Sequence, residues 1–163
     1  MKIITYGDEL LRNKSLPVEE FNPQLANHIF GMFDIMKKAR GIGLAAVQVG
    51  ILQRFFITEV TDDKQRIFIN PEIIQTSMEQ DVYEEGCLSI PGINYDVRRP
   101  YGVVIQAWNE RGKPFTFTAE GLLARVIQHE YDHLEGRLFI DRIEKSQRNK
   151  LIDEYLNLKD NRN

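Results

Sequence analysis

The sequence has little cysteine and no long apolar run, and each shortage excludes a class of protein. With a single cysteine, Cys87, the chain cannot form an internal disulfide, which favours a reducing compartment. The longest weakly polar run, residues 41–52, is too short to cross a membrane. The first residues also lack the apolar segment of a signal peptide. We therefore expect a cytoplasmic protein without a membrane partner.

A strong net charge is missing as well. The formal net charge is −3 at pH 7, so nothing in the overall charge favours direct readout of nucleic acid. The chain does have a hydrophobic fraction of 42% in 163 residues, which is enough to bury a core. We expect residues 1–163 to form a single catalytic domain.

Local patterns predict an α+β fold. Asn22-Pro23 is typical of a helix start, and apolar residues at helical spacing follow it as far as Gly41. Segments rich in β-prone residues flank turn residues and predict two hairpins. We expect antiparallel or mixed strands packed around a central helix, with an N-terminal and a C-terminal helix. The expected helices are 23–40, 120–134 and 144–158. The expected strands are 54–58, 66–69 with a candidate extension at 72–74, 103–108 and 114–118.

Histidine is also scarce, yet two of the three histidines stand in one motif. His129 and His133 are four residues apart, so on a helix both imidazoles point to the same side. Glu130 follows the first of them and can carry a proton beside a metal without binding it. This His-Glu-x-x-His pattern predicts a metal site on the central helix, with a third ligand elsewhere in the chain.

Two residues compete for the position of third ligand. A zinc metallopeptidase of the thermolysin type would use a glutamate about twenty residues on, and Glu154 stands at a suitable distance. Cys87 is the other candidate, because its thiolate and two imidazoles would leave a fourth position for water, as catalytic sites require. The third possibility is a non-catalytic metal module, which would need a fourth protein ligand.

Three segments together resemble the peptide deformylase family, in its order and roughly at its spacing. They are residues 41–48 (GIGLAAVQ), 85–89 (EGCLS) and 128–134 (QHEYDHL). The resemblance implies removal of the formyl group from N-formylmethionine on newly made polypeptides by metal-activated water. It also implies that Cys87, His129 and His133 hold the metal, typically ferrous iron, with nickel, cobalt or zinc as substitutes.

The same resemblance assigns roles around the metal. Glu130 is implied as the catalytic acid and base. The side-chain amide of Gln48 and the backbone N–H of Leu88 are implied as donors to the formyl oxygen, whose developing charge needs such groups. Gly43 lies beside Gln48 in a stretch of small residues that lets another group approach the backbone closely.

A substrate pocket is expected along the metal helix. Leu122 and Val126 precede His129 at helical spacing, so they form one stripe that leads away from the metal. Tyr83 and the stem of Arg125 match family positions near the pocket for the methionine side chain. Some members carry an apolar residue where this chain has Arg125.

Two ionic features complete the expectations. Glu85 and Arg99 are expected to pair and to support the loop that carries the cysteine ligand. The C-terminal helix is a candidate for docking on the ribosome, as in some relatives of the family, although acidic residues dilute its positive charge. Its basic residues near the start are Arg142, Lys145, Arg148 and Lys150.

Overall fold

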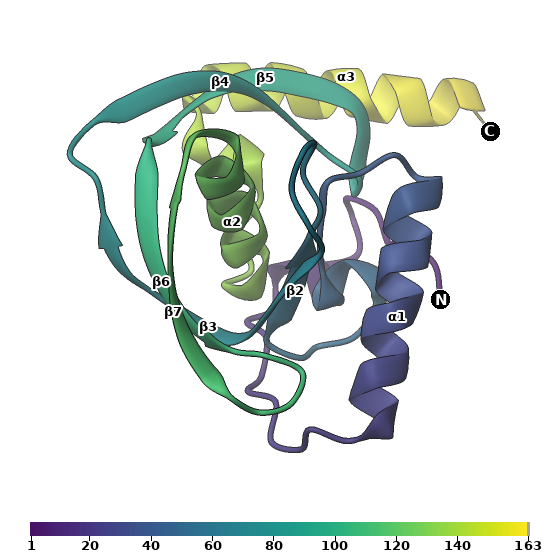
Figure 1. Ribbon diagram of the computed structural model, residues 1–163. Helices are drawn as coiled ribbons and strands as arrows, with labels where there is room; N and C mark the ends of the chain where they lie inside the picture. The colour runs from purple at the N-terminus through teal and green to yellow at the C-terminus, as the bar shows by residue number, and fades with distance from the viewer. Residues whose placement is uncertain (163) are drawn as a thin grey trace.

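Two antiparallel sheets enclose helix α2 (Gly121–Leu134), which lies at the centre of the molecule (Figure 1). The structure is a computed structural model that describes residues 1–162. The five-stranded sheet has the order β1-β2-β3-β6-β7, and a separate sheet pairs β4 with β5. The strands are β1 (Gly43–Ala45), β2 (Phe55–Thr58), β3 (Arg66–Thr76), β4 (Gln80–Cys87), β5 (Ile90–Pro100), β6 (Gly102–Trp108) and β7 (Pro114–Glu120).

The two predicted hairpins are confirmed. Strand β2 pairs with β3, and β6 pairs with β7, both antiparallel. Strand β3 includes the candidate extension at residues 72–74 and runs on to Thr76, because a register shift after Ile69 lets it pass Pro71 and pair with β6. Asn70 adopts a φ of 49° at this irregularity, and its side chain bonds the backbone of Val18 in both directions.

Strand β5 was absent from the predicted elements. It follows β4 after a turn of only two residues, Leu88 and Ser89, which places Cys87 opposite Ile90. The alternation of buried Ile93, Val97 and Arg99 with more exposed neighbours is that of a half-buried strand. This hairpin carries the only cysteine, so it decides where that thiol lies relative to α2.

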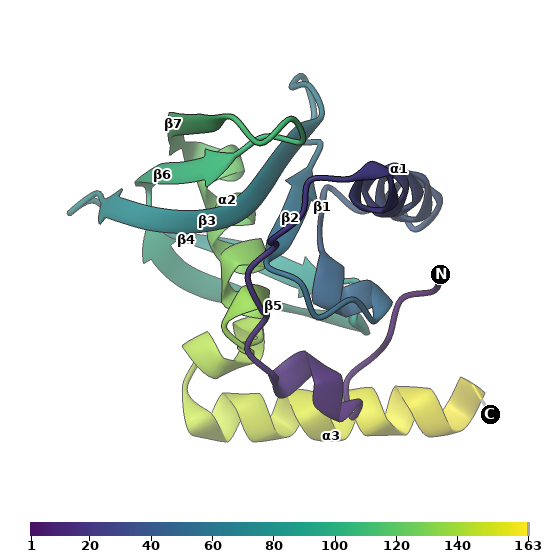
Figure 2. The same cartoon turned by 90° about the horizontal axis from the view of Figure 1, so that it is seen from below.

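The two outer helices flank the sheets. Helix α1 (Pro23–Lys38) begins as predicted, with the Asn22 side chain accepting a bond from the Leu25 N–H at 3.0 Å. Helix α3 (Lys145–Arg162) extends past its predicted end and lies along β5 (Figure 2). Short 3-10 helices occupy Glu9–Arg12 (η1), Ala46–Val49 (η2) and Phe139–Arg142 (η3).

From Ala124 onward, every residue of helix α2 except the half-buried Tyr131 is buried, but the faces of the helix differ. Ala124, Ile127 and Leu134 pack into an apolar cluster with side chains of the five-stranded sheet. Removal of this apolar surface from water stabilises the docked helix by roughly 25 cal/mol per Å². Six polar or charged residues of the helix are also buried, and they carry the site: Arg125, Gln128, His129, Glu130, Asp132 and His133.

Within residues 1–162, no helix combines the length and the apolar character needed to cross a lipid bilayer.

Candidate metal centre and active site

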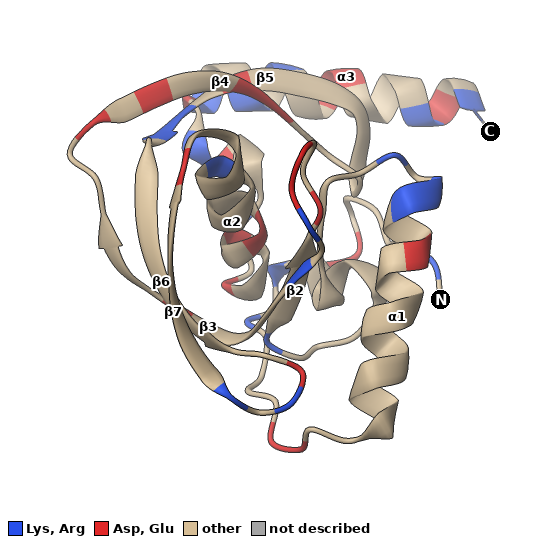
Figure 3. Ribbon diagram, viewed as in Figure 1, with Lys and Arg blue, Asp and Glu red and all other residues tan. Residues whose placement is uncertain are grey.

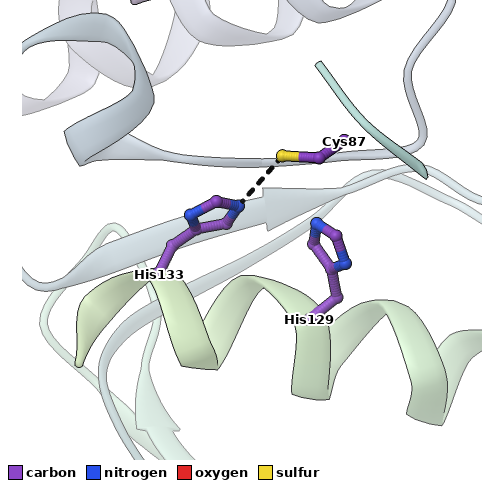
Figure 4. A group of neighbouring side chains, drawn as sticks. All are labelled: Cys87, His129 and His133. Atoms are coloured by element: carbon purple, nitrogen blue, oxygen red, sulfur yellow. Dashed lines mark hydrogen bonds between the residues drawn. The ribbon is translucent and has the colours of Figure 1, made fainter. Parts of the chain in front are cut away.

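Cys87, His129 and His133 form a cluster of three potential metal ligands. One donor atom from each residue lies within 4.8 Å of the other two. Figure 4 shows both imidazoles extending from α2 toward the sulfur of Cys87 at the end of β4. The Cys87 Sγ to His133 Nε2 distance is 3.4 Å. Tetrahedral ligands at ordinary zinc distances lie about 3.6 Å apart, so the cluster fits a metal ion.

Glu85 fixes the orientation of the first imidazole. Its Oε1 lies 2.8 Å from His129 Nδ1, which leaves Nε2 of that ring for the metal side. The carboxylate is itself bonded by Arg99, with Nε to Oε2 at 2.6 Å and Nη2 to Oε1 at 3.0 Å. The predicted Glu85–Arg99 ion pair is therefore present. A carboxylate behind a ligand histidine is a common way to fix its tautomer.

The ionisable groups of the cluster perturb one another. Burial opposes ionisation of Glu85, but the hydrogen bonds from His129 and Arg99 outweigh it and lower the pKa to about 2. For His129, bonds to Cys87 and Glu85 overcome burial and raise the pKa well above its usual value. Burial, with the nearby charge of His129, lowers the pKa of His133.

Glu130 lies buried between α2 and strand β1. Burial is the main cause that raises the pKa of its carboxyl group, to about 7. Within residues 1–162, its Oε1 is buried and accepts no hydrogen bond. Gly43 makes room for this side chain, because a Cβ there would stand 2.6 Å from Glu130 Oε2. The absence of a side chain at Gly43 is therefore a steric requirement of the site.

Gln48 and Leu88 lie beside Cys87. The amide nitrogen of Gln48 is 3.1 Å from Ser89 Oγ and 3.6 Å from Cys87 Sγ. Its carbonyl oxygen accepts the N–H of Ala45 at 2.9 Å, so the amide cannot rotate freely. Leu88 belongs to the turn that follows Cys87, and both residues line the same cavity.

A cavity of about 660 Å³ opens beside the cluster. Its lining includes the residues predicted for the substrate pocket: Tyr83, Leu122, Arg125 and Val126. Their exposure differs, since Tyr83 and Leu122 are 53% and 39% exposed whereas Val126 is 6% exposed. The cavity thus has an open rim and a buried wall that ends at Glu130 and His129.

Arg125 lines this cavity, but its charged group is turned to other partners. Its Nη1 bonds Glu85 Oε2 at 2.6 Å, and its Nη2 bonds the Asp81 carbonyl at 2.9 Å. The guanidinium carbon also lies 5.7 Å from the ring centroid of Tyr83. The guanidinium charge, which an apolar residue at this position would lack, is therefore bonded to other groups of the protein.

Glu154, the competing candidate for third ligand, is exposed on α3. In the part of the chain that the structure describes, Cys87, His129 and His133 are the one group of three or more such residues close enough to share a metal. The geometry therefore favours the thiol.

The polypeptide deformylase profile matches residues 1–149. The chain belongs to the polypeptide deformylase family. A peptide deformylase of Treponema pallidum (strain Nichols) is 48% identical over 159 residues, which cover 98% of each chain. One of Clostridium botulinum is 52% identical over 140 residues, or 86% of this chain and 94% of that protein.

Solved structures agree with the sequence comparison. A peptide deformylase from Synechococcus elongatus, crystallised in complex with actinonin, superposes with a TM-score of 0.90 at 39% identity. The match covers 94% of this chain and 86% of that one. The family gives this chain its activity, the hydrolytic removal of the N-formyl group from newly made polypeptides.

Sequence reasoning missed three buried polar residues that support the site. Asp132 accepts bonds from Arg99 and from Arg142, both at 3.0 Å to its Oδ2. Gln128 donates to the Pro100 carbonyl at 2.9 Å, and Ser89 contacts Gln48. Asp132 lies inside the His-Glu-x-x-His motif. Because this motif predicts a buried helix, a charged residue within it needs a partner, and this signal could have identified Asp132 as a supporting residue.

Proposed function

We propose that the chain hydrolyses the formyl amide of N-formylmethionyl peptides in the cavity beside α2, with Cys87, His129 and His133 holding a divalent metal. The observation that carries the proposal is the convergence of one sulfur and two imidazole nitrogens within 4.8 Å at the wall of this cavity. When bound, the ion supplies a Lewis acid that makes hydroxide available near neutral pH and polarises a carbonyl.

Ferrous iron is the proposed resident metal, with nickel, cobalt or zinc as substitutes. The support for iron is the family resemblance. A set of one thiolate and two imidazoles suits zinc as well as iron by ligand type.

Glu130 is the proposed acid and base. It takes a proton from the attacking water and delivers it to the amine as the carbon–nitrogen bond breaks, which gives formate and a free N-terminus. Its support is positional: the carboxyl group follows the ligand His129, lines the cavity, and has one buried oxygen without a bond within residues 1–162. Gly43 serves this role by leaving the space that the carboxyl group occupies.

Gln48 and Leu88 are the proposed donors to the formyl oxygen. The Gln48 amide is held by Ala45 at its oxygen, so its nitrogen is directed toward the side of Cys87 and Ser89. Donors that are fixed before the reaction need no reorganisation when charge develops on the oxygen. The backbone N–H of Leu88 would act from the turn beside Cys87.

The methionine side chain of the substrate is proposed to lie along α2. Val126 and Leu122 supply apolar contacts about one and two turns from His129, respectively. The methylene stem of Arg125 and the ring of Tyr83 complete the wall. An unbranched thioether is well suited to such a mixed surface of aliphatic and aromatic groups.

Release of formate from an N-formylmethionyl peptide, measured anaerobically with the iron-loaded protein, tests the proposal. We expect Glu130→Gln to abolish release while the protein still binds metal, and Cys87→Ala to lose both. Glu154→Ala should keep both and serves as the control for the competing ligand. Metal binding that survives Cys87→Ala but not Glu154→Ala would overturn the proposed site.

The cytoplasm is the proposed location, because the substrate is a nascent chain and the single thiol favours a reducing compartment. Ribosome docking through α3 is the proposed further partnership. This helix carries charges of both signs (Figure 3). Arg142 and Arg148 pair with Asp132 and Asp141.

The exposed Lys145 and Lys150 are therefore the better candidates for contact with ribosomal RNA. Cosedimentation with ribosomes should weaken when both are changed to glutamate, while hydrolysis of a short peptide stays unchanged. Cosedimentation of this double variant at the level of the unsubstituted protein would contradict the docking proposal.

A further inference from the structure

One face of α2 is polar, and all four of its residues bind the β4–β5 hairpin. Arg125, Gln128, His129 and Asp132 follow the spacing i, i+3, i+4 and i+7, which places them on one side of a helix. All four are buried. The helix therefore meets the five-stranded sheet through apolar side chains and the two-stranded sheet through hydrogen bonds.

Arg125 makes the largest contribution to this polar contact. Its Nη1 donates to Glu85 Oε2 at 2.6 Å and to the Val97 carbonyl at 2.9 Å, and its Nη2 donates to the Asp81 carbonyl at 2.9 Å. Seven side-chain hydrogen bonds join α2 and the hairpin within residues 1–162, and Arg125 makes three of them. One guanidinium thus links the helix to both strands.

The residues that Arg125 holds stand next to the metal ligands. Glu85 is two residues before Cys87 on β4, and its other oxygen bonds His129 Nδ1 at 2.8 Å. Asp81 is the second residue of the same strand. A shift of the hairpin against α2 would therefore move the thiol away from the two imidazoles and turn the His129 ring. Groups behind a metal ligand commonly control its geometry in this way.

We infer that Arg125 is a positioning residue for the metal site: by clamping β4 and β5 to α2 it holds Cys87 and the Glu85–His129 pair in register. This inference rests on the proposed function and adds a role to the contact between the Arg125 stem and the substrate. The clamp acts through the guanidinium, whereas the pocket wall uses the methylene stem, so one substitution can separate the two.

Arg125→Met tests the inference, because methionine keeps an unbranched stem and removes every hydrogen bond. The affinity of the folded protein for cobalt is measured by competition with a chelator, and the thiolate-to-cobalt absorption reports the geometry at Cys87. We expect the affinity to fall by about tenfold or more and the absorption to change. We also expect kcat to fall with little change in KM for a formylmethionyl peptide.

Arg98→Met is the matched control. Arg98 is an exposed neighbour on β5, and its side chain forms no ion pair or hydrogen bond within residues 1–162. This variant should keep the cobalt affinity and the spectrum. Arg125→Lys retains a charge and can reach one acceptor, so its affinity should lie between those of the unsubstituted protein and Arg125→Met. If Arg125→Met does not fold, the lysine variant carries the test.

An unchanged cobalt affinity and spectrum in the folded Arg125 variant, whatever its melting temperature, would overturn the inference, since a purely structural role changes stability alone. The proposed function is judged separately by the unsubstituted protein. If that protein released no formate, the function would fail, and the chelator titration would still decide whether Arg125 positions the metal ligands.

Discussion

Adding a single methyl group at Gly43 should separate catalysis from metal binding. A Cβ at this position would lie 2.6 Å from Glu130 Oε2 and 2.7 Å from Val126 Cγ1. The φ of Gly43 is not in the left-handed region, so alanine fits the backbone and the effect of Gly43→Ala is purely steric. Strand β1 is fully buried and paired with β2, which leaves the Glu130 carboxyl group as the part most able to move.

The structure sets the size of the effect. A movement of about 0.8 Å would restore an ordinary contact of 3.4 Å between the new methyl group and the carboxylate. Misplacement of a reacting group by this order of distance costs roughly 10²-fold in rate. Overpacking of a buried site costs about 1–3 kcal/mol of unfolding free energy. The three atoms nearest to such a Cβ belong to Glu130 and Val126, and none belongs to the proposed ligands Cys87, His129 and His133.

Three measurements check the prediction for Gly43→Ala: formate release, cobalt affinity and thermal unfolding. We expect kcat to fall about 10²-fold, cobalt affinity to stay unchanged and the melting temperature to fall by roughly 2–12 °C. Gly31→Ala is the control, because a Cβ at that helical position meets only the flexible end of Met1, at 3.4 Å. Full activity in the Gly43 variant would refute the steric account of Glu130.

Two further predictions concern charge. Glu85→Ala leaves the buried guanidinium groups of Arg99 and Arg125 without their carboxylate. We therefore expect denaturant titration to show a loss of about 3–5 kcal/mol in unfolding free energy. The same substitution at the exposed Glu79 is the control and should be neutral. The Arg66 hydrogen bond lowers the pKa of Asp63 below 3.8. The ionised carboxylate therefore stabilises the fold above that pH, and this stabilisation is lost as the pH falls below it. Asp63→Asn should therefore lower stability by roughly 0.5 kcal/mol at pH 7, and the difference should shrink as the pH falls below 3.8. A difference that grew in acid would contradict this assignment.

The elements with a clear local pattern could be predicted from the sequence. The central helix has apolar residues at helical spacing and an N-terminal boundary after β-prone residues, and its predicted range of 120–134 agrees closely with Gly121–Leu134. The β6–β7 hairpin was equally clear, because alternating residues flank the turn at Asn109. In these segments the local preference and the tertiary environment agree.

Strand β5 could not be found in the same way. Pro91, Gly92 and Pro100 interrupt its signal, and its inward residues include the charged Arg99, so the apolar alternation of a strand is broken. Its burial depends on Glu85 and Asp132, which lie on two other elements. The pairing of Arg99 with Glu85 was predicted, but the contact with Asp132 on α2 depends on the folded chain and has no local signature in the sequence of β5.

The site was partly accessible to sequence reasoning. The spacing of His129 and His133 predicted two ligands, and the family resemblance supplied Cys87, which is 46 residues before His133. The partners of Arg125 could not be predicted from the sequence. Helical spacing placed its stem near the pocket but could not show which groups its guanidinium contacts. Long side chains choose among rotamers according to partners that only the folded chain provides.

X-ray absorption spectroscopy of the iron-loaded protein tests the central claim most directly, because it counts the sulfur and nitrogen neighbours of the metal. We expect one sulfur scatterer from Cys87 and two imidazoles from His129 and His133. The sulfur contribution should disappear in Cys87→Asp. A first coordination sphere with only nitrogen and oxygen in the unsubstituted protein would contradict the metal centre described above.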